Sequence, residues 1–384
     1  MPVAINKCMD YDYQAVKNTL DNQISRLIAD RQFFENKNIV IKPNLLMKAT
    51  PQKCITTHPI VLEAVIEIIK SYNPKSITVA ESPGGPYTHT TLGIIYKSTG
   101  IAAVCEKTGV NLNYDTSSEN MSNPDGAVCK VFNIISPIKN ADVIVDLCKL
   151  KTHSLTTMSA SIKNLFGTIP GIEKFEMHTR YKDPENFEKM LVDLCFMHTE
   201  YKPVLSIVDA VYGMEGDGPS GGDVRNFGLL LSSLNPFNLD VCCAKVLGLN
   251  GKIGYVNEAS QRGYCVKDAS ELYLFGADIK DYLIDNVKLP QTKSLVLLKV
   301  LPKIFGGKVN KFFEPRPIIS KKCIGCGECS RSCPVQTIEM TKNKNGKKVA
   351  RINPDKCIKC YCCQELCPIN AVNIKKNFVF KIMK

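Results

Sequence analysis

The chain has 384 residues, of which 44% are apolar and 22% are charged, and this composition excludes general disorder and a small disulfide-stapled secreted domain. The net charge is +12, yet residues 315–384 hold 15 Lys and Arg against 4 Asp and Glu, whereas residues 1–314 hold 34 against 33. The length predicts two or three domains. Because the sequence shows no signal-peptide pattern and no apolar run of bilayer length, we expect a cytoplasmic protein without a membrane span.

Short apolar runs alternate with helical patterns over residues 1–290. Strands are expected at 38–45, 76–82, 141–147, 203–211 and 227–234, and helices at 12–31, 59–72, 88–108, 185–200 and 237–248. Such a pattern predicts an α/β fold, an open, largely parallel or mixed sheet with flanking helices. The strand order does not follow from the pattern.

Residues 291–320 have the composition of a connector, because an apolar stretch at 294–301 is followed by several prolines and glycines. Its lysines would allow it to lie on an anionic membrane. Packing between domains is the favoured interpretation, since the stretch is short. The predicted organisation is therefore an α/β domain at 1–290, a connector at 291–320 and a small α+β ferredoxin-like domain at 321–384.

Eight C-terminal cysteines form two copies of C-x2-C-x2-C-x3-C-P, 34 residues apart. The first copy is Cys323, Cys326, Cys329 and Cys333, and the second is Cys357, Cys360, Cys363 and Cys367. In this spacing three thiolates wrap one cubane and the fourth reaches the other cluster. We therefore predict two [4Fe–4S] clusters, one on Cys323, Cys326, Cys329 and Cys367 and the other on Cys357, Cys360, Cys363 and Cys333. Eight such thiolates do not divide naturally into two zinc sites, and Cys362 is expected to be a bystander.

Between the two motifs, Asn345-Gly346 separates two short apolar runs and predicts a β-hairpin. With both motifs intact, residues 320–375 resemble bacterial two-cluster ferredoxins, and the resemblance implies low-potential, one-electron transfer. The basic surplus of this region would attract a soluble, acidic redox partner. A merely solvated face is an equal alternative, and nucleic acid is a weaker one, because no aromatic residues alternate with the lysines.

Polar side chains follow the predicted strands of the larger domain, where ligands bind in open α/β sheets. The candidates for binding an anionic small molecule are Lys42, Asn44, Glu81, Lys149, Lys151, Lys163 and Asn164, with Glu215, Gly216 and Gly218 in a glycine-rich loop. His153, His178 and Asp209 are the candidates for proton transfer. Each has a structural alternative: the loop is more usually a tight turn, a lone His is more often a core or capping residue, and Asp209 and Asp240 would cap helices. An additional metal held by histidines and Glu81 or Asp209 is a weaker possibility, because no two of the histidines share a ligand spacing.

Six segments of the larger domain resemble the DUF362 family, a domain of unknown function often joined to a ferredoxin module. They are residues 42–44, 57–59, 81–85, 149–153, 162–171 and 208–222. The resemblance implies that these segments form one site, but it implies no reaction.

The combined hypothesis is a cytoplasmic, ferredoxin-dependent oxidoreductase that acts on an anionic small molecule in the α/β domain. Tethering an electron donor raises its effective concentration at the acceptor. Two alternatives remain: a non-catalytic electron carrier whose α/β domain docks a partner enzyme, and a non-redox enzyme whose clusters are structural.

Overall fold

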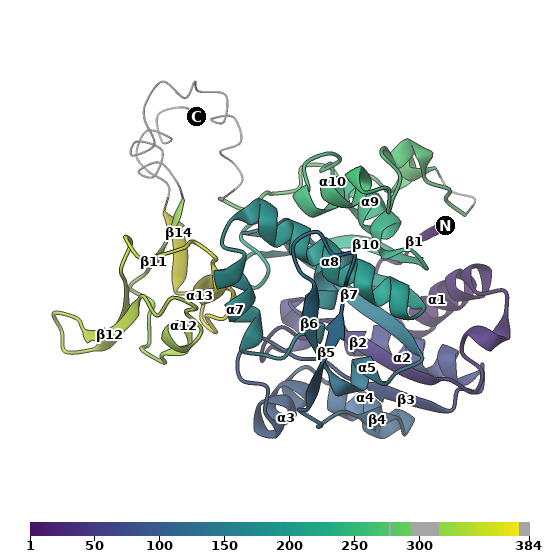
Figure 1. The fold of residues 1–384 in the computed structure, drawn as a ribbon, viewed down its shortest axis with the longest axis horizontal. Helices are drawn as coiled ribbons and strands as arrows, with labels where there is room; N and C mark the ends of the chain where they lie inside the picture. The colour runs from purple at the N-terminus through teal and green to yellow at the C-terminus, as the bar shows by residue number, and fades with distance from the viewer. Residues whose placement is uncertain (276–277, 293–314, 376–384) are drawn as a thin grey trace.

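The computed structural model describes residues 1–275, 278–292 and 315–375, a large α/β part beside a small cysteine-rich part (Figure 1). We call residues 1–292 the sheet domain and residues 315–375 the cluster domain. Most of the predicted connector, residues 293–314, lies outside the described residues. Its two interpretations and the predicted domain boundaries therefore stay predictions.

One eight-stranded sheet forms the centre of the sheet domain, in the order β1-β10-β9-β7-β2-β3-β4, with β8 paired to β7. The strands are β1 (Val3–Lys7), β2 (Asn38–Pro43), β3 (Ser76–Val79), β4 (Asn111–Leu112), β7 (Val143–His153), β8 (Thr157–Ser159), β9 (Val204–Glu215) and β10 (Asp223–Ser233). Pairs from β9 to β4 are parallel, whereas β8, β10 and β1 pair antiparallel. The predicted α/β class with a largely parallel sheet is confirmed.

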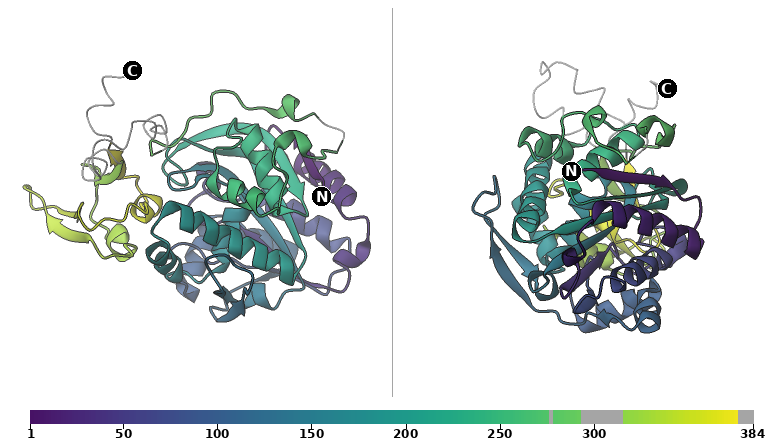
Figure 2. Two further views of the ribbon diagram at one scale, coloured as in Figure 1. Left: turned by 45° about the horizontal axis from the view of Figure 1, so that its top comes forward. Right: turned by 90° about the vertical axis from the view of Figure 1, so that its right-hand side faces the viewer.

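Helices cover both faces of this sheet (Figures 1 and 2). One face carries α1 (Tyr13–Leu27), α2 (Pro59–Lys70), α3 (His89–Ser98) and α4 (Ile101–Thr108), and the other carries α8 (Pro184–Tyr201), α9 (Pro236–Val246) and α10 (Gly254–Gln261). The central strand β7 supplies both cores, with Val145 and Leu147 on the first face and Ile144 and Cys148 on the second. A strand segment that packs on both faces is rich in Val, Ile and Leu, and the run at residues 143–147 made the start of β7 recognisable in the sequence.

The structure differs from the predicted elements in three ways. The helix expected over 88–108 is two helices, because Gly100 between them has φ of +80°. Strands β7 and β9 run past their predicted ends to His153 and Glu215, through polar residues that are buried. Within the sheet domain, the α-helices and strands that were not predicted are β1, β4, β8, α10, β5 (Ser118–Ser122), β6 (Val131–Ile135), α5 (Ser136–Lys139), α6 (Ser161–Asn164) and α7 (Glu173–Arg180).

The cluster domain lies at one end of the sheet domain, and its hairpin points away from the sheet (Figure 2). Its elements are β11 (Arg316–Ile319), α12 (Glu328–Arg331), β12 (Ile338–Lys342), β13 (Lys348–Ile352), α13 (Cys362–Glu365) and β14 (Val372–Lys375). The predicted hairpin is present as β12–β13, and β11 pairs with β14. Over the three described ranges, no helix is long and apolar enough to cross a membrane.

Candidate functional site

The two cysteine motifs adopt the same backbone conformation. In the first motif Gly325 and Gly327 have φ of +72° and +83°, and in the second the equivalent residues Lys359 and Tyr361 have φ of +57° and +64°. Side chains other than glycine are uncommon at positive φ, particularly bulky ones such as tyrosine. The second loop therefore keeps the shape of the first at a conformational cost, which indicates that the shape itself is required.

The thiols of the first group surround one cavity. It is lined by Cys323, Cys326, Cys329 and Cys367, which come from both motifs. Burial, and after it the neighbouring Cys323, Cys367 and Cys326, together raise the pKa of Cys329 to about 11. The backbone N–H of Ala371 donates to Cys367 Sγ at 3.1 Å, a contact that favours a thiolate there.

The other four thiols form a second group. Burial raises the pKa of Cys357, and Cys360 and Cys333 act in the same direction. The Cys333 Sγ accepts a hydrogen bond from the Thr337 N–H at 3.3 Å, as Cys367 does from the residue four positions on. Within the described ranges, no three His, Cys, Asp or Glu side chains meet as ligands of one metal ion. Sets of four cysteine thiolates are the usual ligands of iron–sulfur clusters.

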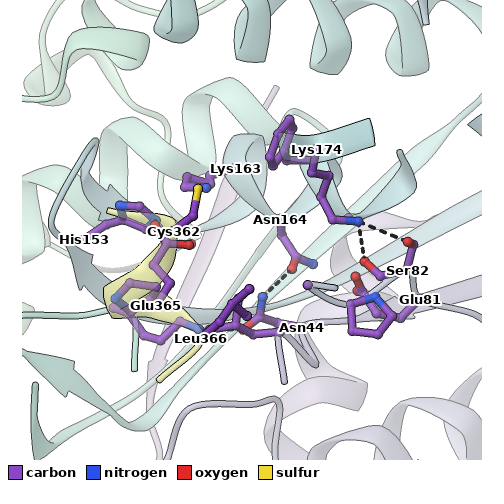
Figure 3. Close-up of a pocket in the computed structure, with 18 of the residues that line it drawn as sticks. Asn44, Glu81, Ser82, His153, Lys163, Asn164, Lys174, Cys362, Glu365 and Leu366 are labelled. Carbon is purple, nitrogen blue, oxygen red and sulfur yellow. Dashed lines mark hydrogen bonds and ion pairs between the residues drawn. The ribbon is translucent and has the colours of Figure 1, made fainter. Parts of the chain in front are cut away.

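A second cavity lies between the two domains, beyond the carboxyl ends of β2, β3 and β7 (Figure 3). The sheet domain lines it with Asn44, Glu81, Ser82, Lys151, His153, Ser159, Lys163, Asn164, Phe166, Lys174, Phe175 and His178, and the cluster domain with Cys362, Glu365 and Leu366. The space between these side chains is ≈ 670 Å³, open solvent included. The part of this space that the centre of a water-sized sphere can reach is ≈ 80 Å³, which is room for several waters or an anion of a few heavy atoms.

Three lysines at this cavity are held by the protein itself. Lys42, just behind the wall, lies 2.5 Å from Glu81 Oε2. Lys151 donates to Asn44 Oδ1 and to the Ile55 carbonyl, both at 2.7 Å. Lys174 donates to the carbonyl oxygens of Ser82 at 2.7 Å and Ile169 at 2.6 Å. Burial lowers the pKa of Lys151 and of Lys174 to about 7.

Lys163 is different, because no hydrogen bond or ion pair joins its amino group to any residue that the structure describes. Its Nζ lies over the rings of Phe166 at 5.2 Å and Phe187 at 5.9 Å. Burial lowers its pKa, and Glu365 and Cys362 oppose this effect. In Figure 3 the Lys163 amino group lies beside the Cys362 side chain, at the wall formed by the cluster domain. A half-buried cation at a cavity wall is suited to bind an anion.

Two histidines also line the cavity. His178 stacks on Phe187 with ring centroids 4.4 Å apart, and burial together with Lys163 lowers its pKa to about 3, so the imidazole is neutral near pH 7. His153 Nδ1 accepts the Leu155 N–H at 3.1 Å, and its Nε2 lies 3.2 Å from Glu365 Oε1. The Nδ1 contact places the proton of a neutral ring on Nε2, facing Glu365. Burial raises the pKa of Glu365, which favours its protonated form.

Glu81 is buried against a glycine. A Cβ at Gly167 would lie 2.1 Å from Glu81 Oε1 and 2.8 Å from Lys42 Nζ, so only glycine fits. Burial raises the pKa of Glu81 to about 7, although Lys42 lowers it. Asn44 and Asn164 complete this side of the cavity, with the Asn44 amide donating to Asn164 Oδ1 at 3.0 Å.

Asp209 and Lys149 lie away from the cavity lining, in a separate buried cluster. Lys149 Nζ is 2.9 Å from Asp209 Oδ2, and the Tyr11 hydroxyl donates to Asp209 Oδ1 at 2.9 Å. Asp209 also accepts the backbone N–H of His58, the residue that caps α2, and the His58 ring stacks on Tyr11 at 3.6 Å. The N-cap of α2 is His58 itself, whose ring accepts the Ile60 N–H, so Asp209 contacts the cap residue but does not cap the helix.

The glycine-rich loop packs along the end of β7. Glu215 pairs with Arg225 at 2.7 Å, and the Gly216 N–H donates to the Lys288 carbonyl. A Cβ at Gly218 would lie 2.1 Å from the Thr152 carbonyl, so glycine is required there for close packing. None of the three residues lines the interdomain cavity, although Pro219 of the same loop does.

Several residues that line the interdomain cavity were not predicted. Lys174 lies three residues after Gly171, the end of a segment assigned to the site. This closeness in sequence was the feature that could have indicated Lys174 as a lining residue. No sequence feature indicated that Glu365 and Leu366 would line the cavity, because the packing of the cluster domain against the sheet domain leaves no pattern in the sequence. Cys362, expected to be a bystander of the cluster, is part of the same wall.

The fold and the cysteine groups define an iron–sulfur protein in which a ferredoxin-type domain is joined to an α/β domain. The comparisons with known proteins agree. Residues 39–245 match the family model of DUF362, a domain of unknown function, and residues 322–371 match a 4Fe-4S dicluster domain. The chain belongs to the DUF362 family, and its C-terminal domain binds iron–sulfur clusters and serves electron transfer.

One curated relative is the thylakoid-associated protein sll1697 of Synechocystis sp., which is 29% identical over 284 residues, 72% of this chain and 83% of that protein. Among solved structures, the lactate racemase apoprotein of Thermoanaerobacterium thermosaccharolyticum gives a TM-score of 0.41 at 16% identity, covering 65% of this chain. A Thermotoga maritima protein gives 0.36 at 12% identity, covering 55%. The chain spans only 57% and 54% of these two chains, and neither score establishes a shared fold.

Proposed function

We propose that this protein is an oxidoreductase that exchanges electrons with a small organic anion bound in the interdomain cavity. The observation that supports it most directly is the composition of the cavity wall. Cys362 and Leu366 line the cavity, and each is the chain neighbour of a motif cysteine, Cys363 and Cys367. A bound molecule would therefore lie close to the electron-transfer groups, which is the purpose of joining the two domains.

The proposal includes two [4Fe–4S] clusters with crossed ligands. The first, cluster one, would be held by Cys323, Cys326, Cys329 and Cys367, the four thiols that line one cavity. The second, cluster two, would be held by Cys357, Cys360, Cys363 and Cys333. When bound, the clusters supply one-electron transfer at low potential. Amide N–H bonds to Cys333 and Cys367 stabilise the thiolates for that role.

Lys163 is the residue that we assign to the anion. Lys42, Lys151 and Lys174 already have partners, so their role is to hold Glu81, Asn44 and the chain around Ser82 in place. An anion could pair with the Lys163 amino group without breaking an existing hydrogen bond or ion pair of that group. Its aromatic neighbours exclude water, and this strengthens the attraction between opposite charges.

Proton transfer falls to His153 and His178, because reduction of an organic molecule usually takes up protons. Both line the cavity, whereas Asp209 lies in the separate cluster with Lys149. His178 has its pKa lowered to about 3, so its ring is neutral near pH 7 and would pass a proton on without keeping it. The His153 Nε2 lies 3.2 Å from Glu365 Oε1, and burial raises the pKa of Glu365, so a protonated Glu365 beside His153 would be the proton donor. A cytoplasmic location remains a prediction.

The test uses the full chain purified without oxygen. Iron and sulfide are quantified, released small molecules are identified by mass spectrometry, and the reduced protein is mixed with small carboxylates and phosphate esters. We expect about eight irons per chain and reoxidation of the clusters by one class of anion. Lys163→Met should raise the anion concentration needed for half-maximal reoxidation about tenfold or more. Lys97→Met, at an exposed lysine of α3, is the control.

Two results would contradict the proposal. Eight irons with no bound molecule and no reoxidising anion would favour the carrier alternative, in which the sheet domain docks a partner enzyme. Zinc in place of iron would overturn the cluster assignment itself.

A further inference from the structure

The charge of the cluster domain is concentrated on its surface. Over residues 315–375 the exposed cations are Arg316, Lys321, Lys322, Arg331, Lys342, Lys344, Lys347, Lys348, Arg351, Lys356 and Lys375. The exposed acidic residues of the same range are Glu339 and Asp355, since Glu328 is half-buried and Glu365 is buried. Such an asymmetry attracts a negatively charged partner over roughly a Debye length, ~8–10 Å in physiological salt.

One part of this surface combines the charge with an accessible cluster ligand. Cys326 is exposed, unlike Cys323 and Cys329, and the neighbouring Ile324 is 55% exposed. An exposed cysteine at a cluster site marks the side from which the cluster is accessible, and a protruding aliphatic side chain is suited to the centre of a small interface.

Basic residues surround Ile324 and Cys326. Lys321 and Lys322 directly precede the motif. The Arg331 guanidinium donates to the Cys326 carbonyl at 3.2 Å, although it also pairs with Glu328. The Lys348 backbone lies against the same loop, because a Cβ at Gly325 would be 2.4 Å from its carbonyl oxygen. We call Lys321, Lys322, Ile324, Cys326, Arg331 and Lys348 the cluster-one face.

We propose that the cluster-one face is the docking surface for an acidic electron-carrier protein. Another part of the domain is already used, because α13 lines the interdomain cavity with Cys362 and Glu365. The face offers a small apolar centre, a basic rim and an accessible cluster ligand, which together match a transient redox interface. An anionic membrane would also bind the basic rim. Membrane binding, however, does not require an accessible cluster ligand, whereas electron transfer between proteins does. The inference rests on the proposed function for its need of an electron source.

The test measures binding and cluster reduction, so that it remains interpretable when no substrate is known. The carrier is an acidic plant-type ferredoxin, and its affinity for the cluster-loaded protein is measured by calorimetry at low and high salt. The double variant K321E/K322E should weaken binding about tenfold or more at low salt, and high salt should reduce this difference. Stopped-flow reduction by the carrier should slow in parallel, whereas reduction by dithionite should not.

Matched variants on the sheet domain serve as controls. K75E/K97E makes the same charge change at two exposed lysines and should alter affinity by no more than about twofold. Ile324→Ala should weaken binding at both salt concentrations, in contrast to Ile94→Ala at a similarly exposed position. Equal effects of the two double variants would overturn the proposal. The proposal would also be overturned if K321E/K322E no longer bound phosphatidylglycerol vesicles but still bound the carrier with normal affinity.

Discussion

Glu81 shows how a single position governs the candidate site. Its carboxylate is buried beside Lys42, and such a pair is stable only when geometry compensates for lost hydration. Gly167 provides that geometry by leaving room for the Glu81 carboxylate. The sequence pointed to Glu81 and Lys42 because both follow apolar strands, but their pairing needed the register of β2 and β3. The cavity-facing Lys163 was named in the sequence too, and only the structure separates it from lysines that already have partners.

Gly167→Ala tests this dependence. The added methyl group would meet Glu81 Oε1 at 2.1 Å and would force the ion pair apart. We expect the free energy of unfolding to fall by about 3 kcal/mol or more, as for other broken buried pairs. Thermal unfolding of the anaerobic protein measures the effect.

Gly93→Ala is the matched control, because Gly93 lies inside α3 and its added Cβ would meet only Tyr114, at 3.7 Å. Alanine should stabilise this helix by up to about 1 kcal/mol. Equal destabilisation by both variants would show that the Glu81 contact is not the cause.

At the level of elements, Asp193 on α8 ties three segments together. Its carboxylate accepts the backbone N–H groups of Ala127, Val128 and Cys129, each at 2.8 Å, in the turn between β5 and β6. It also pairs with Arg262 at the end of α10. Helix α8 was predicted within one residue at each end, but neither the hairpin nor its anchor was. The acceptor and its donors are more than 60 residues apart, so periodicity could not reveal the contact.

Asp193→Asn should therefore destabilise the sheet domain. The amide keeps the shape of the carboxylate but removes its charge and sets a donor group against donors. We expect a loss of about 3 kcal/mol, seen as a lower unfolding midpoint.

For comparison, Asp183→Asn makes the same chemical change at the N-cap of α8, where Asp183 accepts the Asn186 N–H. Asparagine caps as well as aspartate, so this variant should change stability by less than about 0.5 kcal/mol. A similar effect at both positions would contradict the assigned role of Asp193.

Desolvation lowers the pKa values of three histidines across the molecule: His178 and His198, which are buried, and His58, which is half-buried. Burial lowers the pKa of His58 to about 4 and of His178 and His198 to about 3, against an ordinary value of about 6.5. Below pH 6.5 the unfolded chain thus binds protons that the folded chain does not, and stability falls as the pH falls. Glu81 and Asp240 act in the opposite sense, because burial raises their pKa values to about 7 and about 8.

His198→Gln isolates one of these groups. His198 is buried on α8, with Nε2 2.9 Å from Thr168 Oγ1, which glutamine can still reach. Wild-type stability should fall by about 1.4 kcal/mol per pH unit below pH 6.5 through this group alone. The deficit of the variant relative to wild type should therefore shrink between pH 6.5 and pH 4. A difference that stays constant between pH 6.5 and pH 4 for His198→Gln would refute the assignment.

Much of the overall organisation was predictable from sequence. The α/β class follows from Val- and Ile-rich strands between helices, and iron–sulfur binding follows from cysteine spacing, because both depend on local patterns. Strand order and the meeting of the two domains depend on contacts between distant residues. That is why Lys149 and Asp209 were grouped with Lys163, although the structure puts them in a separate cluster.

The wall that α13 contributes to the interdomain cavity has a consequence for quality control in the cell. Cys362, Glu365 and Leu366 lie between cysteines assigned to the clusters, so the same short segment shapes both the cavity and the cluster sites. A chain that has not yet received its iron, or has lost it to oxygen, would lack a firm wall on that side. Cluster insertion would then control ligand binding. The cavity would retain a small molecule only in chains that also carry the clusters needed for electron transfer.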